Sequence, residues 1–254
     1  MIELHKREPG RVLVIGHRGA EALAPENTWA AFEAGYRAGA DLLELDVQLS
    51  CDGEAIVSHD FTLQPKLGDP RWVRDLAWDE LRTLDVGSWF GSEFAGERIP
   101  RFADVLAWAR GRVALQVDLK HGFVEPDDDR LEMAALELIE RAEMGDRVLI
   151  SSWDLVALGR VRARCPEIPL AVNLRERVAD PLGRVQATGA CWVTVYWPQI
   201  ERQTVACLQA GGVTVNLVGL FTGDYAEALR LGVDAVTAAD PGAARAALAQ
   251  LREA

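Results

Sequence analysis

The chain has 254 residues, 49% of them hydrophobic and 26% charged, which is ordinary globular usage and excludes a disordered or fibrous protein. Asp and Glu outnumber Lys and Arg by 39 to 27, and the resulting net charge of -12 argues against sequence-independent binding to nucleic acid. The length fits one large domain, and α/β barrels often reach it as a single unit.

The N-terminal sequence and the cysteines bear on location. The first residues, MIELHKREPGRVLVIG, lack the apolar segment and cleavage site of a signal peptide, and no apolar stretch approaches membrane-spanning length. The four cysteines follow no C-x-x-C spacing, so we expect neither a zinc site, nor a redox motif, nor disulfides. We therefore expect a cytoplasmic protein with no stable membrane insertion.

Apolar runs typical of strands alternate along the chain with segments of helical periodicity. The predicted strands lie within 11–17, 41–49, 112–120, 147–153, 168–174, 191–197, 213–220 and 233–239. The predicted helices lie within 27–39, 101–111, 130–145, 154–165, 204–212, 225–232 and 243–254. This alternation predicts a (β/α)₈ TIM barrel spanning residues 1–254 as a single domain, with an open doubly wound sheet as the alternative.

Two segments have features beyond this alternation. In the first predicted helix Trp29, Phe32 and Tyr36 share one face and are expected in the core, with Asn27 as N-cap and Gly39 as the stop. From about residue 61 to 100 the chain is rich in Gly, Pro, Trp and charges, which predicts a small inserted subdomain with a short helix in 78–85.

Polar residues end the first three predicted strands, and barrel active sites form at that end. The first strand ends at His17 and Arg18. Alternation places Glu44 and Asp46 on one face of the second strand, and it places Gln116, Asp118 and Lys120 together on the third. By the same alternation His121 points away from the site, and His5 lies in the solvated N-terminal tail.

The dipeptide Asp52-Gly53 after the second strand is typical of a two-residue hairpin turn. With that turn Cys51 faces Glu54, and counting outward pairs Asp46 with His59, so that the histidine joins the acids on one side of the sheet. A one-residue bulge would shift this register.

The predicted cluster suits phosphodiester hydrolysis. Three carboxylates at neighbouring strand ends favour Mg²⁺ or Ca²⁺, and an arginine and a lysine beside them favour phosphate. Two histidines supply a general acid and a general base. Any one of these groups alone would more readily be explained as a structural ion pair, but seven converging on one barrel mouth indicate function.

The segment GHRGAEALAPENTWAAFEAGYRAGADLLELDVQLSCDGEAIVSHDFTL, residues 16–63, resembles the N-terminal signature of the glycerophosphodiester phosphodiesterase family. The resemblance joins His-Arg-Gly, Pro-Glu-Asn-Thr, Glu-x-Asp and His-Asp in the family's order. It continues through LDVGSWFGSEFAGERIPRFADVL, residues 84–106, to LGVDAV near the C-terminus, and thus spans nearly the whole chain.

The resemblance implies a TIM barrel with a subdomain inserted after the His-Asp motif, and hydrolysis of glycerophosphodiesters to sn-glycerol 3-phosphate and an alcohol. It implies that His17 and His59 are the acid/base pair and that Arg18 and Lys120 contact the phosphate. It also implies a metal, Mg²⁺ or Ca²⁺ in relatives, with these ligands: Glu44, Asp46 and Asp118.

Four positions depart from the family pattern. Asp118 stands where Glu is common in a Glu-x-Lys motif. The family's Trp-Thr-Val-Asn is replaced by a segment around 216–219, its TLxR by TLQP at 62–65, and its Thr-Asp-x-Pro by TAADP at 237–241. The shorter Asp118 is expected to change the metal preference or to place a water between the acid and the metal. The departure at 216–219 affects the expected substrate pocket more than the chemistry, and the other two bear on which alcohol is accepted.

Two other functions remain open from the sequence, as does a homo-oligomeric state. A lysophospholipase D would use the insertion's aromatics as an acyl groove, although packing of the insertion is the preferred role of Trp72, Trp78, Trp89 and Phe90. A non-catalytic phosphodiester-binding barrel is the other alternative, and the complete set of acids, histidines and lysine argues against it. In each case the expected partner is a small phosphodiester.

Overall fold

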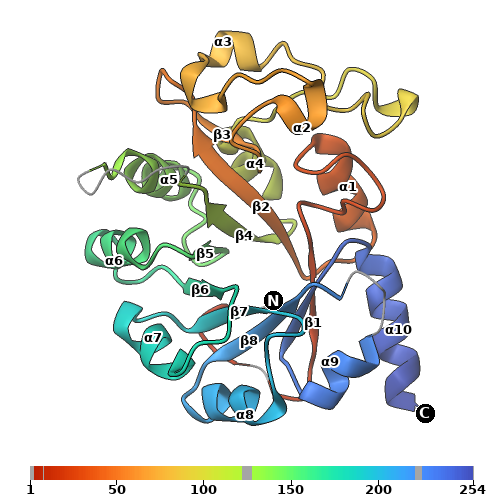
Figure 1. Ribbon diagram of the computed structural model, residues 1–254, viewed down its shortest axis with the longest axis vertical. Helices are drawn as coiled ribbons and strands as arrows, with labels where there is room; N and C mark the ends of the chain where they lie inside the picture. Colours follow the sequence, from red (N-terminus) through yellow and green to blue (C-terminus); the bar gives the residue numbers. More distant parts are fainter. Residues whose placement is uncertain (1–2, 8, 122–127, 221–224, 254) are drawn as a thin grey trace.

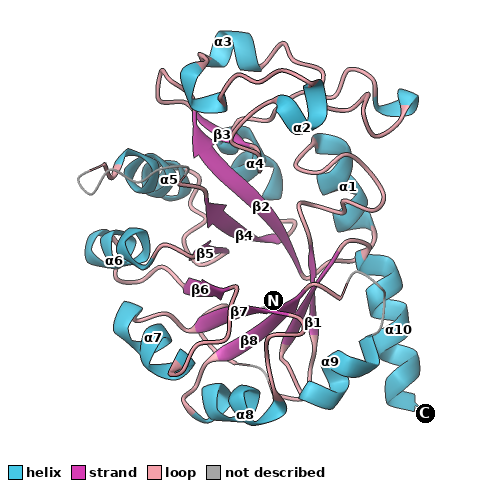
Figure 2. Ribbon diagram, viewed as in Figure 1, coloured by secondary structure: helices cyan, strands magenta, loops and turns pink. Residues whose placement is uncertain are grey.

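The computed structural model describes residues 3–7, 9–121, 128–220 and 225–253. Eight parallel strands form a closed barrel, in which β1 pairs with both β9 and β2, and helices surround it (Figures 1 and 2). The barrel strands are β1 Leu13–Gly16, β2 Leu42–Leu49, β4 Ala114–Leu119, β5 Val148–Ser152, β6 Leu170–Leu174, β7 Trp192–Tyr196, β8 Thr214–Val218 and β9 Ala235–Ala238. The predicted TIM barrel is confirmed, and each barrel strand falls within its predicted segment.

The outer helices follow the strands in the expected order. They are α1 Trp29–Arg37, α4 Phe102–Ala109, α5 Arg130–Arg141, α6 Leu155–Arg164, α7 Pro181–Thr188, α8 Arg202–Ala210, α9 Tyr225–Leu231 and α10 Pro241–Glu253. Helix α7 was not predicted, because it is short and buries only two residues, Val185 and Thr188. Among the described residues, no helix combines the length and apolarity needed to cross a membrane.

The barrel interior is apolar at one end and polar at the other. At the apolar end, Leu4 packs inside the barrel against residues near the start of four strands: Leu42 of β2, Ala114 of β4, Leu149 of β5 and Trp192 of β7. The carbonyl oxygen of Leu4 accepts a hydrogen bond from the Trp192 indole (2.7 Å). Alternation makes every second residue point inward, so positions two and four residues further along these strands line the opposite end. The functional site lies at that polar end.

The hairpin after β2 has a different register from the predicted one. Strand β3, Ala55–Val57, pairs antiparallel with β2, but Val47 faces Val57, and the Ser58 amide donates to the Asp46 carbonyl (2.9 Å). The loop has a third residue, because Gly53 adopts a positive φ of 85° after the turn that begins at Ser50. Asp46 therefore faces Ser58 rather than His59, and the predicted pairing is wrong by one residue.

Helix α1 begins one residue later than predicted. Thr28 is the N-cap, and its hydroxyl accepts a hydrogen bond from the Ala31 amide, whereas Asn27 has φ 58° and serves the site instead. Of the aromatic residues predicted for the core, Phe32 is fully buried and Trp29 packs against the core, but Tyr36 is 39% exposed. The ring of Tyr36 instead packs edge-on against Trp108 of α4.

The insertion lies over the far end of β2 and β3 (Figure 1). It contains α2 Gln64–Leu67, α3 Trp78–Leu81 and two 3₁₀ turns, Val73–Asp75 and Ser92–Phe94, so the short helix expected in 78–85 is present over its first half. A separate apolar cluster holds it together, including Leu63, Val73, Leu81 and Ile99. This cluster makes the segment compact in spite of its irregular backbone.

Candidate active site

The seven side chains predicted to converge do so at the polar end of the barrel. They line one cavity of about 140 Å³. The seven are His17, Arg18, Glu44, Asp46, His59, Asp118 and Lys120. His59 reaches the cavity despite the changed hairpin register, because β3 ends at Val57 and the chain bends at the histidine.

Three carboxylates form the buried floor of this cavity. Glu44, Asp46 and Asp118 are 7%, 1% and 6% exposed, and one oxygen of each lies within 4.8 Å of the others. The ammonium of Lys120 joins two of them, at 2.8 Å from Asp46 Oδ1 and 2.5 Å from Asp118 Oδ2. Glu44 is held by the Arg18 backbone amide, which donates to its Oε2 (2.9 Å).

The pKa values of these acids show how their charges compete. Burial and the neighbouring Asp46 raise the pKa of Glu44 to about 7, and burial raises that of Asp118. Burial also opposes ionisation of Asp46, but the charges of Lys120, His59 and Arg18 outweigh it and lower the pKa of Asp46. Two of the three acids thus remain incompletely neutralised, and an all-oxygen donor set of this kind fits a hard divalent cation.

Two asparagines that sequence reasoning missed orient the acids. The Asn27 side-chain amide donates to Asp46 Oδ2 (2.8 Å), and its oxygen accepts from the Asp46 backbone amide (3.2 Å). Asn173 of β6 donates to Asp118 Oδ1 (2.9 Å). Asn27 looked like a helix cap in the sequence, whereas Asn173 could have been found by applying the inward alternation to β6.

Arg18 faces the cavity with its guanidinium partly committed. Its terminal nitrogen lies 2.7 Å from Glu26 Oε2, while Nε is 3.5 Å from Asp46 Oδ2 and makes no hydrogen bond with any described residue. The Glu26 carboxylate also accepts from Lys66 of α2 (2.6 Å), whose ammonium lies 3.0 Å from Asp60 Oδ2. Lys66 thereby fills the space between two acids with positive charge.

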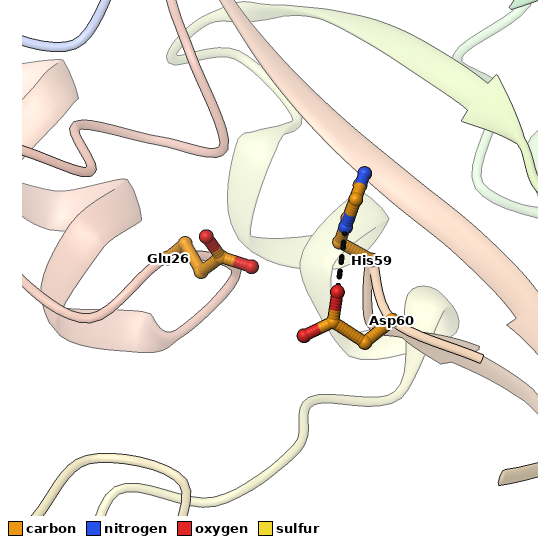
Figure 3. A group of neighbouring side chains, drawn as sticks. All are labelled: Glu26, His59 and Asp60. Atoms are coloured by element: carbon orange, nitrogen blue, oxygen red, sulfur yellow. Dashed lines mark hydrogen bonds and ion pairs between the residues drawn. The ribbon is translucent and has the colours of Figure 1, made fainter. Parts of the chain in front are cut away.

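Each histidine is oriented by a carboxylate on its Nδ1. His17 Nδ1 lies 2.6 Å from Glu21 Oε1, and His59 Nδ1 lies 2.9 Å from Asp60 Oδ1 (Figure 3). Such a contact holds the ring and leaves the other ring nitrogen for a second partner. Burial lowers the pKa of His17, but the Glu21 hydrogen bond and the charges of Glu44 and Glu21 outweigh it and raise the pKa.

The remaining cavity wall comes from strands in which the sequence predicted no catalytic, metal-binding or phosphate-binding residue. It consists of Asn173, Arg175, Thr194, Tyr196, Val218 and Thr237, with Gln116 beside the acids. Asn216, at one of the departures from the family pattern, is buried behind this wall and donates to the Thr237 hydroxyl (2.9 Å). The signal in the sequence was the inward alternation along β6 to β9.

Residues expected outside the site lie outside it. His121 is absent from the cavity lining, and its Nε2 is 3.7 Å from Glu132 of α5. The insertion's aromatics also pack elsewhere: Trp89 contacts Phe90 edge-on, and Trp78 packs against the insertion's own apolar cluster.

Comparisons with known proteins identify the family. The model of the glycerophosphoryl diester phosphodiesterase family matches residues 17–243. A glycerophosphodiester phosphodiesterase from Caldanaerobacter subterraneus is 31% identical over 91% of this chain and 95% of its own, and one from Bacillus altitudinis is 31% identical over 83% and 82%.

Solved structures agree in fold over nearly the whole chain. A phosphodiesterase from Oleispira antarctica, in complex with its product sn-glycerol-3-phosphate, is 27% identical with a TM-score of 0.87, covering 93% of this chain and 96% of its own. A glycerophosphodiester phosphodiesterase from Agrobacterium tumefaciens is 26% identical with a TM-score of 0.76, covering 92% and 99%. The chain therefore belongs to the glycerophosphoryl diester phosphodiesterase family.

Proposed function

We propose that this protein hydrolyses glycerophosphodiesters to sn-glycerol 3-phosphate and an alcohol, with the help of a divalent metal. The observation that carries the proposal is the meeting of two carboxylate-oriented histidines and three buried acids in one cavity. Family membership and the product complex of the Oleispira antarctica relative support the substrate class.

The acids are the proposed metal ligands. Glu44, Asp46 and Asp118 would hold Mg²⁺ or Ca²⁺, because both prefer carboxylate oxygens. When bound, the ion would supply positive charge to the phosphoryl oxygens. Asp118 reaches less far than the glutamate common in relatives, and the bond from Asn173 fixes its position.

Arg18 and Lys120 are the proposed phosphate contacts. Arg18 keeps its Nε free of hydrogen bonds to described residues, and a guanidinium can donate to two phosphate oxygens. Lys120 is buried and adds a fixed positive charge beside Asp46 and Asp118. Both cations are held in place before the substrate arrives. They can therefore stabilise the negative charge that develops on the phosphoryl oxygens in the transition state.

The histidines divide the proton transfers. We assign His17 as the general acid, because its raised pKa keeps it protonated at higher pH, and His59 as the general base. His59 takes a proton from the attacking water, the water oxygen bonds to phosphorus, the bond from phosphorus to the alcohol oxygen breaks, and His17 protonates that oxygen. Glycerol 3-phosphate and a neutral alcohol leave.

The same proposal extends to the whole chain and its location. We infer one catalytic domain over residues 1–254 with about 61–100 as its insertion, since the first and last barrel strands pair with each other. We place it in the cytoplasm, where four unpaired cysteines suit a reducing compartment.

Purified protein incubated with glycerophosphocholine and Mg²⁺ or Ca²⁺ is expected to release glycerol 3-phosphate, measured by a coupled dehydrogenase assay. Adding a lysophospholipid as competitor separates this activity from a lysophospholipase D, which would prefer the acylated lipid. Binding of diesters without hydrolysis, across several diesters and both metals, would contradict the proposal and favour a non-catalytic barrel.

The Glu21→Gln substitution is expected to move the alkaline limb of the kcat/KM profile to lower pH. Glu21 raises the pKa of His17, so its loss lowers that pKa, and the general acid then loses its proton at a lower pH. The measurement is the pH dependence of kcat/KM for glycerophosphocholine. Glu33→Gln, which removes an acid paired with Arg37 on α1, is the matched control. An unmoved alkaline limb would refute His17 as the acid.

A further inference from the structure

Arg175 adds a third cation to the cavity, on the wall opposite Arg18. It follows the last residue of β6, and the strand order places β6 four strands from β1 in either direction around the ring. Its side chain lines the same cavity as His17 and Arg18, which follow β1. A substrate whose phosphate lies near β1 would therefore extend one of its arms toward Arg175.

Arg175 differs from the other two cations in its partners. Arg18 and Lys120 lie within ion-pair distance of acids, whereas no described carboxylate lies within that distance of Arg175. Its guanidinium is instead held by aromatic rings, with Cζ 3.2 Å from the centre of Trp153 and 5.8 Å from that of Tyr196. Stacking of this kind fixes the guanidinium while leaving its N–H donors available to a ligand.

The same arrangement disfavours a cationic ligand. An indole face is the surface that best binds a quaternary ammonium, but Trp153 already has the Arg175 guanidinium against it and the Lys120 ammonium 5.5 Å from its centre. Choline at this wall would meet two like charges beside the indole. An oxyanion would meet unpaired donors.

We propose that Arg175, positioned by Trp153 and Tyr196, forms a subsite for an anionic group on the alcohol part of the substrate. The subsite, which rests on the proposed function, makes the enzyme prefer diesters whose alcohol carries a second phosphate or a carboxylate over those that carry choline. Arg175 is thus a specificity-determining residue.

The test compares kcat/KM for three diesters that differ in the charge of the alcohol: glycerophosphocholine, glycerophosphoinositol and glycerophosphoinositol 4-phosphate. The wild-type protein is expected to prefer the last. Arg175→Gln should lower its kcat/KM by about fivefold, the size of a partly exposed charge interaction, and should leave the neutral inositol diester nearly unchanged. Arg175→Glu should reverse the preference toward choline.

Arg177→Gln is the matched control, because Arg177 is exposed, pairs with Glu201 and lines a different cavity. Its three kcat/KM values should equal those of the wild type. An equal loss on all three diesters in Arg175→Gln would overturn the subsite and place Arg175 on the shared phosphodiester, and no change on any diester would overturn it as well.

Equilibrium binding of the same three diesters, measured by calorimetry, separates the subsite from the proposed function. If the wild-type protein hydrolyses none of them, the proposed function fails, while a fivefold loss of affinity for the 4-phosphate diester in Arg175→Gln still supports the subsite. Equal affinities in the two proteins would overturn it without reference to turnover.

Discussion

Replacing His17 or His59 by alanine is expected to lower kcat for glycerophosphocholine by at least ~10²-fold, because each proton transfer by a positioned side chain contributes ~10²- to 10⁴-fold. KM should change much less, since the phosphate is held by other groups. The double variant should lose little more than the worse single variant, because the two transfers belong to one displacement.

The matched control for the histidine variants is His5→Ala, which removes an exposed imidazole from the N-terminal segment. It should retain wild-type kcat. Thermal unfolding of all variants separates catalysis from folding, and we expect small shifts in Tm, since neither active-site histidine belongs to an apolar core cluster. A His17→Ala or His59→Ala protein with near wild-type kcat would remove that residue from the acid/base pair.

The substitutions Asp60→Asn and Lys66→Met change the surroundings of His59 without removing its imidazole. Asp60 Oδ1 contacts His59 Nδ1, and the ammonium of Lys66 lies between Asp60 and Glu26. Figure 3 shows Glu26, His59 and Asp60. The His59 hydrogen bond is the largest influence on Asp60, whose pKa it lowers to about 2. We therefore expect both residues to act through His59 rather than on the substrate.

Alternation along strands explains why the acidic half of the site could be predicted from the sequence. Glu44 and Asp46 stand two residues apart in a mainly apolar strand, and Asp118 and Lys120 do the same at the end of β4. The local sequence therefore predicts both the face and the strand end on which they lie. The far wall carries the same period in β6 and β7, but Asn173 and Thr194 are small polar residues of kinds that also occur in ordinary strands.

Contacts between distant segments could not be predicted in the same way. The hairpin register depended on a third loop residue, which Gly53 permits by its positive φ and which the Asp-Gly pair does not distinguish from a two-residue turn. Asn27 was assigned to a helix cap because its neighbours fit one. Its true partner, Asp46, lies nineteen residues away on β2.

Removal of the divalent metal by a chelator is expected to abolish turnover, and excess Mg²⁺ or Ca²⁺ is expected to restore it. Three buried carboxylates cannot all ionise close together without a compensating cation, and Lys120 reaches only two of them. Undiminished turnover in chelator would refute the metal. Asp118→Asn should lose metal-dependent activity, whereas Asp118→Glu, which keeps a carboxylate at this position, should retain it.

Thermal stability provides a second readout of the same site. The Glu44→Gln substitution is expected to abolish activity but to raise the Tm of the metal-free protein. In the metal-free protein the folded-state pKa of Glu44 is raised from 4.5 to about 7, so folding binds a proton more tightly than the unfolded chain does. Stability from this group is present below pH 4.5 and is lost as the pH rises toward 7. Glu44→Gln removes that loss, so without metal the variant should have the higher Tm at pH 8.

Adding Mg²⁺ or Ca²⁺ should raise the Tm of the wild type by binding the folded state, and should raise that of the variant much less. A variant that is inactive yet more stable without metal would mean that Glu44 is retained for binding the cation at the expense of the fold. A variant less stable than the wild type under these conditions would contradict that assignment.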